Sequence, residues 1–303
     1  MNPGEDQENT VNRGQGGAAE PEPLFGDHPR SWHENRYVYP VISRRSGGLS
    51  VGVNLNPDKV CNFDCVYCQV DRSLPAAVRK VDCGLLRQEL ERTIGAVVSG
   101  ELFVGPPFGR VPADLRQFKD IAFSGDGEPT ACPQFLDAVR IAADLRRKYG
   151  LDQVKLVLIT DAAYLARPAV REALAVMDAN NGEIWAKLDA GTESYFRSIN
   201  RPNVSLQVVV DNILDAARVR PIVIQSLWMK VHDSPPPDEE VEAFARRLAW
   251  VLANGGQIRL VQIYTIARRP AEPFVAPLNA PALQAIAEGV TAIASVPIST
   301  YGG

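Results

Sequence analysis

The chain has 303 residues, of which 46% are hydrophobic and 22% are charged, so it can bury a substantial core. Its formal net charge of -4 excludes a globally basic nucleic-acid-binding surface, while a local basic patch is still compatible with it. No stretch approaches the roughly 18 consecutive apolar residues of a membrane helix, and the acidic start of the chain does not fit a secretory signal. We therefore expect a cytoplasmic protein with no membrane partner.

Residues 1–35 are predicted to form a disordered tail, and residues 36–303 a single domain. The tail is rich in Gly, Glu, Asn, Gln and Pro, and its few apolar residues cannot offset the entropy lost on ordering. Residues 37–42 then read as an extra strand. The stretch from Arg44 to Gly48 reads as the turn into the first core strand, which is predicted at 49–55.

Strand and helix patterns alternate through the rest of the chain. A helical period at Leu86, Leu90, Ile94 and Val97 precedes a Gly- and Pro-rich connection. Further strands are predicted near 119–124, 154–160, 183–188, 222–231 and 258–266, and further helices near 133–148, 168–178, 205–219, 238–253 and 280–294. The six resulting βα units indicate an α/β fold with a parallel sheet covered by helices. Periodicity alone leaves open a doubly wound sheet or an incomplete barrel.

Three cysteines with the spacing Cys-x3-Cys-x2-Cys follow the first core strand: Cys61, Cys65 and Cys68. Thiolates select zinc, copper(I) or iron-sulfur clusters. A closed zinc site takes four protein ligands, and the other two cysteines, Cys83 and Cys132, form no second pair. Three thiolates on a four-iron cluster would leave one iron open to a small molecule. The alternative is a zinc or structural thiol loop completed by a histidine.

With Tyr67 directly before the third cysteine, this loop resembles the cluster loop of the radical S-adenosylmethionine (radical SAM) superfamily. The resemblance runs from about residue 36 onward and implies a partial (β/α)6 barrel, which is an incomplete TIM-type barrel. It also implies a [4Fe-4S] cluster on Cys61, Cys65 and Cys68, with S-adenosylmethionine (SAM) chelating the open iron. Sites in parallel α/β folds lie at the carboxyl ends of the strands, where this loop falls.

A second motif, Gly-Asp-Gly-Glu-Pro, ends the strand predicted at 119–124. Gly125 and Gly127 let the backbone approach a ligand, and Glu128 can accept hydrogen bonds from an ammonium group. Read alone, the stretch is an ordinary turn. Beside the cysteines it resembles the superfamily's Gly-Gly-Glu-Pro motif, which contacts the methionine amino group, here with Asp126 inserted between the glycines.

A third motif closes the strand at 183–188, where alternation places Lys187 and Asp189 on one face. These side chains either face water or point into the barrel mouth, where family members bind the ribose and carboxylate of SAM. Gln225 and Gln262 interrupt later apolar strands, and we expect each to satisfy a neighbouring backbone group.

Two basic stretches follow later strands: Arg197 with Arg201, and Arg268 with Arg269. Arginines in such loops can hold a carboxylate or phosphate, and surface solvation is the simpler alternative. Cys83 and Cys132 are interpreted as small structural residues.

The resemblance implies that the reduced cluster cleaves SAM to a 5'-deoxyadenosyl radical, which takes hydrogen from a substrate. A ferredoxin- or flavodoxin-like protein would supply the electron. The Asn-Leu-Asn-Pro, Gly-x-Gly-Glu-Pro-Thr, Lys-Leu-Asp-Ala-Gly-Thr-Glu and Ile-Asn-Arg-Pro stretches look most like the iron-sulfur oxidoreductases grouped with wyosine-type tRNA-modifying enzymes. Because the chain is acidic, a protein or peptide substrate rivals tRNA. A non-catalytic iron-sulfur or zinc binding protein is the alternative from another class.

Overall fold

The computed structural model describes residues 32–72, 78, 80–268, 270 and 272–302. Most of the tail predicted for residues 1–35 therefore lies outside the described residues. Its last four residues are described, and among them Asn35 is buried, with its Nδ2 donating a hydrogen bond to the carbonyl of Val38 at 2.9 Å.

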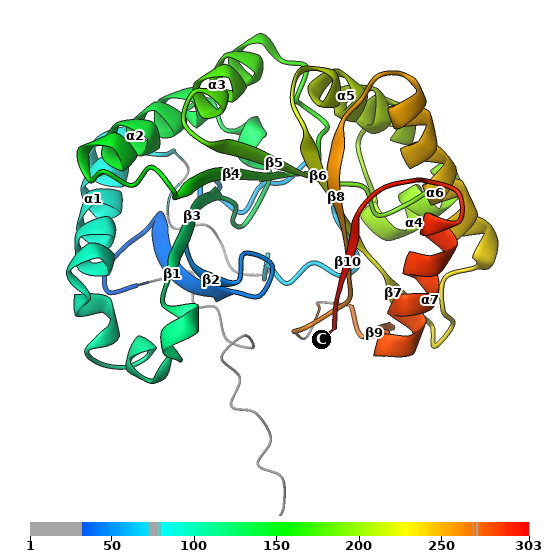
Figure 1. The fold of residues 1–303 in the computed structure, drawn as a ribbon, viewed down its shortest axis with the longest axis horizontal. Helices are drawn as coiled ribbons and strands as arrows, with labels where there is room; N and C mark the ends of the chain where they lie inside the picture. Colours follow the sequence, from blue (N-terminus) through cyan, green and yellow to red (C-terminus); the bar gives the residue numbers. More distant parts are fainter. Residues whose placement is uncertain (1–31, 73–77, 79, 269, 271, 303) are drawn as a thin grey trace, which may run out of the picture.

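A curled eight-stranded sheet forms the centre of the molecule, and helices cover its outer, convex side (Figure 1). The strands lie in the order β1-β2-β3-β4-β5-β6-β8-β10. Only the first pair, β1 with β2, is antiparallel, and the other neighbours are parallel. The strands are β1 (Val38–Ser43), β2 (Gly48–Val53), β3 (Phe118–Phe123), β4 (Lys155–Thr160), β5 (Gly182–Lys187), β6 (Ile222–Leu227), β8 (Ile258–Tyr264) and β10 (Ile298–Tyr301). The partial barrel expected from the sequence is confirmed.

Helices and strands mostly alternate along the chain, while α4 and α5 follow one another without a strand between them. They are α1 (Cys83–Ser99), α2 (Phe135–Lys148), α3 (Pro168–Asp178), α4 (Glu193–Asn200), α5 (Leu206–Val219), α6 (Asp238–Ala253) and α7 (Ala280–Thr291). Their ends follow local rules. The Asp82 side chain accepts hydrogen bonds from Gly84 N and Leu85 N at the start of α1, and Gly100 ends that helix with a φ of 81°. Short 3-10 turns η1 (Glu101–Phe103), η2 (Phe108–Arg110), η3 (Ala113–Leu115) and η4 (Pro129–Ala131) fill the loops that flank β3.

The structure corrects the strand predicted at 222–231. The chain leaves the sheet after Leu227, and β7 (Met229–Val231) pairs with β9 (Val275–Pro277) in a separate two-stranded sheet. The break falls at Trp228, which is fully buried and packs edge-to-face on Phe244 with ring centroids 5.5 Å apart. Because Leu227, Trp228 and Met229 are all apolar, the hydropathy pattern does not indicate this change of direction.

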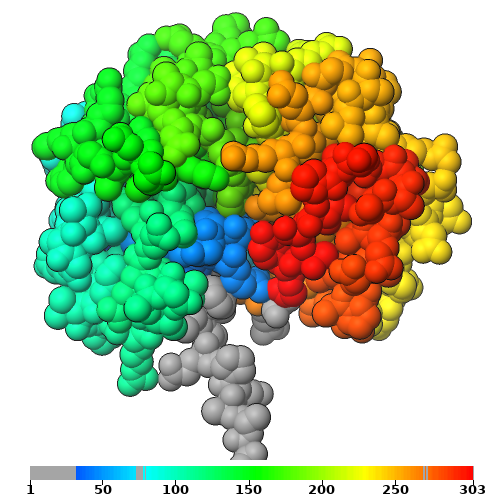
Figure 2. Space-filling model, viewed as in Figure 1, coloured from blue at the N-terminus to red at the C-terminus, as the bar shows by residue number. Residues whose placement is uncertain are grey.

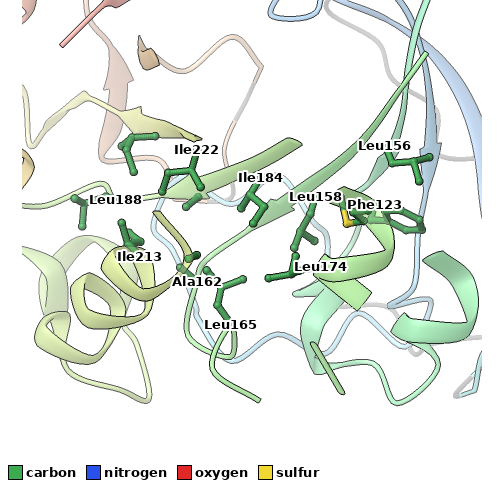
Figure 3. Close-up of a cluster of buried hydrophobic side chains, with 14 of the residues drawn as sticks. Phe123, Leu156, Leu158, Ala162, Leu165, Leu174, Ile184, Leu188, Ile213 and Ile222 are labelled. Carbon is green, nitrogen blue, oxygen red and sulfur yellow. The ribbon is translucent and has the colours of Figure 1, made fainter. Parts of the chain in front are cut away.

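The main core lies between the sheet and its helices. Phe123, Leu158 and Ile184 on successive strands meet Leu174 of α3 there, as Figure 3 shows. Each of the four is at most 2% exposed, and burying such a side chain contributes about 1.5–3 kcal/mol. This packing fixes the strand ends from which the loops of the site emerge.

A smaller cluster fills the concave side of the sheet, with Ala122, Val157, Trp185 and Val223 as its buried members. Side chains alternate along a strand, so Lys187 points to the same side as Trp185. The parallel register then aligns Lys187, Gln225 and Gln262 in one row across β5, β6 and β8. The polar residues noted in the sequence thus lie side by side inside the barrel.

Candidate functional site

A cavity of about 330 Å³ lies at the carboxyl ends of the parallel strands and continues into the barrel. Its lining includes every site residue predicted from the sequence: Cys61, Cys65, Tyr67, Cys68, Gly125, Gly127, Glu128, Lys187 and Asp189. Cys83 and Cys132 are not among the lining residues. The fold therefore brings three separate sequence motifs to one place.

The cysteine loop is held by the end of α4. The backbone N–H groups of Asp64 and Val66 donate to the carbonyls of Asn200 and Ile199, at 3.1 and 2.9 Å. Carbonyls at a helix end lack hydrogen-bond partners within the helix. The loop therefore supplies donors to these carbonyls, and the same hydrogen bonds hold the loop in position. This helix was not predicted, although Thr192, whose side chain accepts from Tyr195 N, is an ordinary N-cap signal.

The three cysteines of the loop are free thiols. Burial is the main cause that raises the pKa of Cys61 to about 11 and that of Cys65 to about 12. Nδ2 of Asn200 lies 3.4 Å from the sulfur of Cys65, and Nη1 of Arg72 lies 3.2 Å from that of Cys68. These donors would stabilise thiolates once a metal displaces the protons.

Asp189 joins the cysteine loop, α4 and β6 through its carboxylate. Its Oδ1 accepts from Leu227 N at 2.9 Å, and its Oδ2 accepts from Asn200 Nδ2 at 2.9 Å and from the hydroxyl of Tyr67. The side chain is 2% exposed. Asp189 thus holds Tyr67 and Asn200 in position, a role that only the three-dimensional contacts reveal.

Lys187 places a cation beside this network. Its Nζ lies 5.4 Å from the centre of the Tyr67 ring, within range of a cation–π contact. Burial lowers the pKa of Lys187, but the neighbouring Tyr264, Asp189 and cysteine groups outweigh burial, and the net shift is upward. Lys187 therefore keeps its positive charge.

The loop after β3 packs closely on the Asn-Leu-Asn-Pro stretch, which explains its glycines. A Cβ at Gly125 would lie 2.3 Å from Oδ1 of Asn54, and a Cβ at Gly127 would lie 2.1 Å from the carbonyl oxygen of Val60. The inserted Asp126 accepts from Asn54 Nδ2 at 2.6 Å. The loop therefore depends on glycine for its approach to the segment that precedes Cys61.

Glu128 is bonded within the protein. Its Oε1 accepts from Thr130 N and from the hydroxyls of Thr130 and Thr160, and its Oε2 accepts from Asp161 N at 2.8 Å. The side chain is 3% exposed. It connects the loop after β3 with the end of β4, and it reaches the cavity at the same time.

Asp161 is a lining residue that the sequence reasoning missed. It is 6% exposed, and its Oδ2 has no hydrogen-bond partner within the part of the chain that the structure describes. Burial, followed by the charge of Glu128, raises the pKa of Asp161 well above its usual range. The available signal was a charged residue directly after the apolar strand β4.

The other polar residues noted in the sequence divide into two groups. Gln225 donates to Gln262 at 2.8 Å, so the two amides bond to each other rather than each to a backbone group. Arg201 pairs with Glu272 at 2.7 Å, and Arg197 pairs with Glu193 at 2.7 Å. Of the last basic stretch, Arg268 lines the cavity and Arg269 lies outside the described residues.

The donor set fits an iron-sulfur cluster with an open position. Three soft thiols from one short loop face one cavity, and two of their sulfurs have a nitrogen donor nearby. Within the described residues, no three His, Cys, Asp or Glu side chains are grouped closely enough to hold a single metal ion. Glu128 and Asp161 supply carboxyl groups, and Lys187 an ammonium group, beside the thiols for a ligand that carries an amino group and a carboxylate.

Comparisons with known proteins agree with the fold. The structure matches SuiB of Streptococcus suis bound to S-adenosylmethionine with a TM-score of 0.57 and 14% identity, over 86% of this chain and 52% of that one. It matches a variant of spore photoproduct lyase with a TM-score of 0.50 and 10% identity, over 86% of this chain and 65% of that one. These likenesses agree with the partial α/β barrel that was expected from the sequence.

In sequence, a UPF0026 protein of Methanocaldococcus jannaschii is 30% identical over 176 residues, which are 58% of this chain and 46% of that protein. The chain thus spans about half the length of the curated relatives it matches. No protein-family model matches it. Within the described residues, no helix is both long and apolar enough to cross a bilayer.

Proposed function

We propose that the chain is a radical SAM enzyme. Cys61, Cys65 and Cys68 would hold a [4Fe-4S] cluster, and SAM would occupy the adjoining cavity. The observation that carries this proposal is that all three thiols line one cavity together with Glu128, Asp161, Lys187 and the loop of Gly125 and Gly127. When bound and reduced, the cluster would supply the electron that cleaves SAM to a 5'-deoxyadenosyl radical.

The chain's own groups would bind and orient this cofactor. The orphaned Oδ2 of Asp161 is a hydrogen-bond acceptor at the cavity wall, suited to the ammonium group or a ribose hydroxyl of SAM. Lys187 would attract an anionic group, because it stays protonated. Asp189 would act as a positioning residue through Tyr67 and Asn200.

Two further parts of the proposal concern partners. The electron would come from a ferredoxin- or flavodoxin-like protein. The hydrogen donor would be a tRNA base or a protein or peptide side chain that reaches the cavity, and salt-sensitive binding to tRNA would separate these two substrate classes.

The test is anaerobic reconstitution with iron and sulfide, followed by reduction and an assay of 5'-deoxyadenosine. We expect the wild type to produce it, and Cys61→Ala, Cys65→Ala and Cys68→Ala each to lose production. Cys83→Ala and Cys132→Ala are matched controls that should retain it. Full production by any of the first three variants would overturn the ligand assignment.

A further inference from the structure

Arg45 is a cation inside the barrel that the proposed SAM site does not use. It belongs to the turn between β1 and β2, and its side chain lines the cavity. Its guanidinium carbon lies 5.0 Å from the ring centre of Tyr264 and 5.8 Å from that of Trp185. These rings come from β8 and β5, which are not neighbours of β2 in the sheet, so Arg45 reaches across the barrel interior.

Within the described residues, Arg45 makes these two ring contacts and has no ion pair or hydrogen bond to an acceptor. A guanidinium carries five N–H donors in a planar fork that matches a carboxylate or phosphate. Aromatic faces attract the charge of the group but do not accept its in-plane N–H donors. The donors of Arg45 are therefore available to a ligand in the cavity.

Two acidic residues of the cavity, Asp189 and Asp120, form no ion pair with this cation. The Asp189 carboxylate is engaged by Tyr67, Asn200 and Leu227 N. Asp120 lines the same cavity, but its carboxyl accepts from Ser50, and burial raises its pKa, which favours its neutral form. Lys187, which stays charged, and Arg45 both act electrostatically on the phenol of Tyr264, so the cavity holds two cations near this ring.

Arg45 also lies at the open side of the barrel. The strands β1 and β10 are the two free edges of the curled sheet. The turn after β1 and the end of β10 meet there, where the neighbouring Arg44 donates to the carbonyl of Gly302. Figure 2 shows the β1–β2 hairpin beside the C-terminal segment on this face. The arginines of this turn therefore lie beside the gap between the two edge strands of the sheet.

We propose that Arg45, between the rings of Tyr264 and Trp185, binds an anionic group of the substrate, either a carboxylate or a phosphate. This inference rests on the proposed function, because it assigns a substrate-binding role to another part of the same cavity. It narrows the substrate to a molecule or residue with such an anion and a hydrogen-bearing part that extends toward the cysteine loop. Lys187, which lines the same cavity, would add a second positive charge for that molecule.

The test is calorimetric titration of the cluster-loaded protein with two probes, inorganic phosphate and succinate, in the absence of SAM. We expect the wild type to bind at least one probe and Arg45→Gln to bind it about 10- to 100-fold more weakly, as the loss of charge-assisted hydrogen bonds implies. Arg45→Lys keeps the charge but not the fork and should give an intermediate affinity. Arg171→Gln, on the exposed face of α3, is the charge-matched control and should bind like the wild type.

Binding of phosphate alone or of succinate alone would support the proposal and identify the anion. Absence of binding of both probes, or equal affinity in Arg45→Gln and the wild type, would overturn it. Equal loss in Arg171→Gln would also overturn it, because the effect would then reflect overall charge. If Arg45→Gln does not fold, the probe affinity of Arg45→Lys tests the proposal by itself. Wild-type affinity in Arg45→Lys would then contradict the role of the planar guanidinium. The titration requires no SAM cleavage, so its outcome is separate from that of the proposed function.

Discussion

Replacement of Asp189 by alanine tests whether this carboxylate stabilises the contact between the cysteine loop, α4 and β6. The substitution removes the acceptor of three buried donors: the Leu227 N–H, the Asn200 amide and the Tyr67 hydroxyl. Each hydrogen bond to a charged group contributes about 1.5–3 kcal/mol. Because water from the cavity can reach part of the vacated space, we expect a total loss of roughly 3–5 kcal/mol in the free energy of unfolding.

The assay is urea unfolding followed by circular dichroism. Asp189→Asn, which keeps one acceptor oxygen, should lose less than Asp189→Ala. Asp211→Ala is the matched control, since that residue is exposed on α5 and is hydrogen-bonded to Gln207. It should change stability by no more than about 0.5 kcal/mol. A loss below about 1 kcal/mol in Asp189→Ala would refute the view that this network is buried and connected.

Three further predictions concern the cavity wall. Gly127→Ala should lose about 1–3 kcal/mol in urea unfolding, because its Cβ would meet the Val60 carbonyl at 2.1 Å; Gly105→Ala, which meets nothing within 4 Å, is the control, and equal losses would contradict the packing argument. Asp120→Asn should be more stable than the wild type near neutral pH, and the gap should close in acid. The raised pKa of Asp120 means that folding favours its protonated form, so its stabilisation is present at low pH and is lost as pH rises through the folded-state pKa; a pH-independent gap in thermal unfolding would count against this. Glu128→Ala should lower both the free energy of unfolding and the SAM affinity measured by calorimetry. It removes the acceptor of the Thr160 hydroxyl and the Asp161 N–H, and it removes a side chain that lines the cavity. Unchanged SAM affinity would argue that Glu128 acts only within the fold.

The parts of the fold that depend on local pattern were predictable. The apolar strands and the amphipathic α6 have strong periodicity, and the expected bounds of 238–253 for that helix agree with the structure. The strand predicted at 222–231 was wrong because hydropathy does not register where a chain turns, and Trp228 continues the apolar run. The short helix α4 and the edge strand β10 have too few residues to give a clear period.

The residues of the site were predictable where chemistry is carried by residue type and spacing, as in the three cysteines. Arg45 was interpreted as part of a turn, and the turn is real, since Gly47 has a φ of 66° there. What the sequence could not show is that the side chain crosses the barrel to two strands about 140 and 220 residues later, which arises from the curl of the sheet. Asn200 belongs to the Ile-Asn-Arg-Pro stretch noted in the sequence, but its contacts with Asp189 and Cys65 depend on the unpredicted α4.

The most direct test of the central claim is the electron paramagnetic resonance spectrum of the reduced, reconstituted protein before and after addition of SAM. The account predicts a [4Fe-4S] signal in the wild type that changes on SAM addition, because SAM would bind the iron that has no cysteine. The triple variant of Cys61, Cys65 and Cys68 should show no such signal. An intact, reduced cluster whose spectrum is the same with and without SAM would contradict the account.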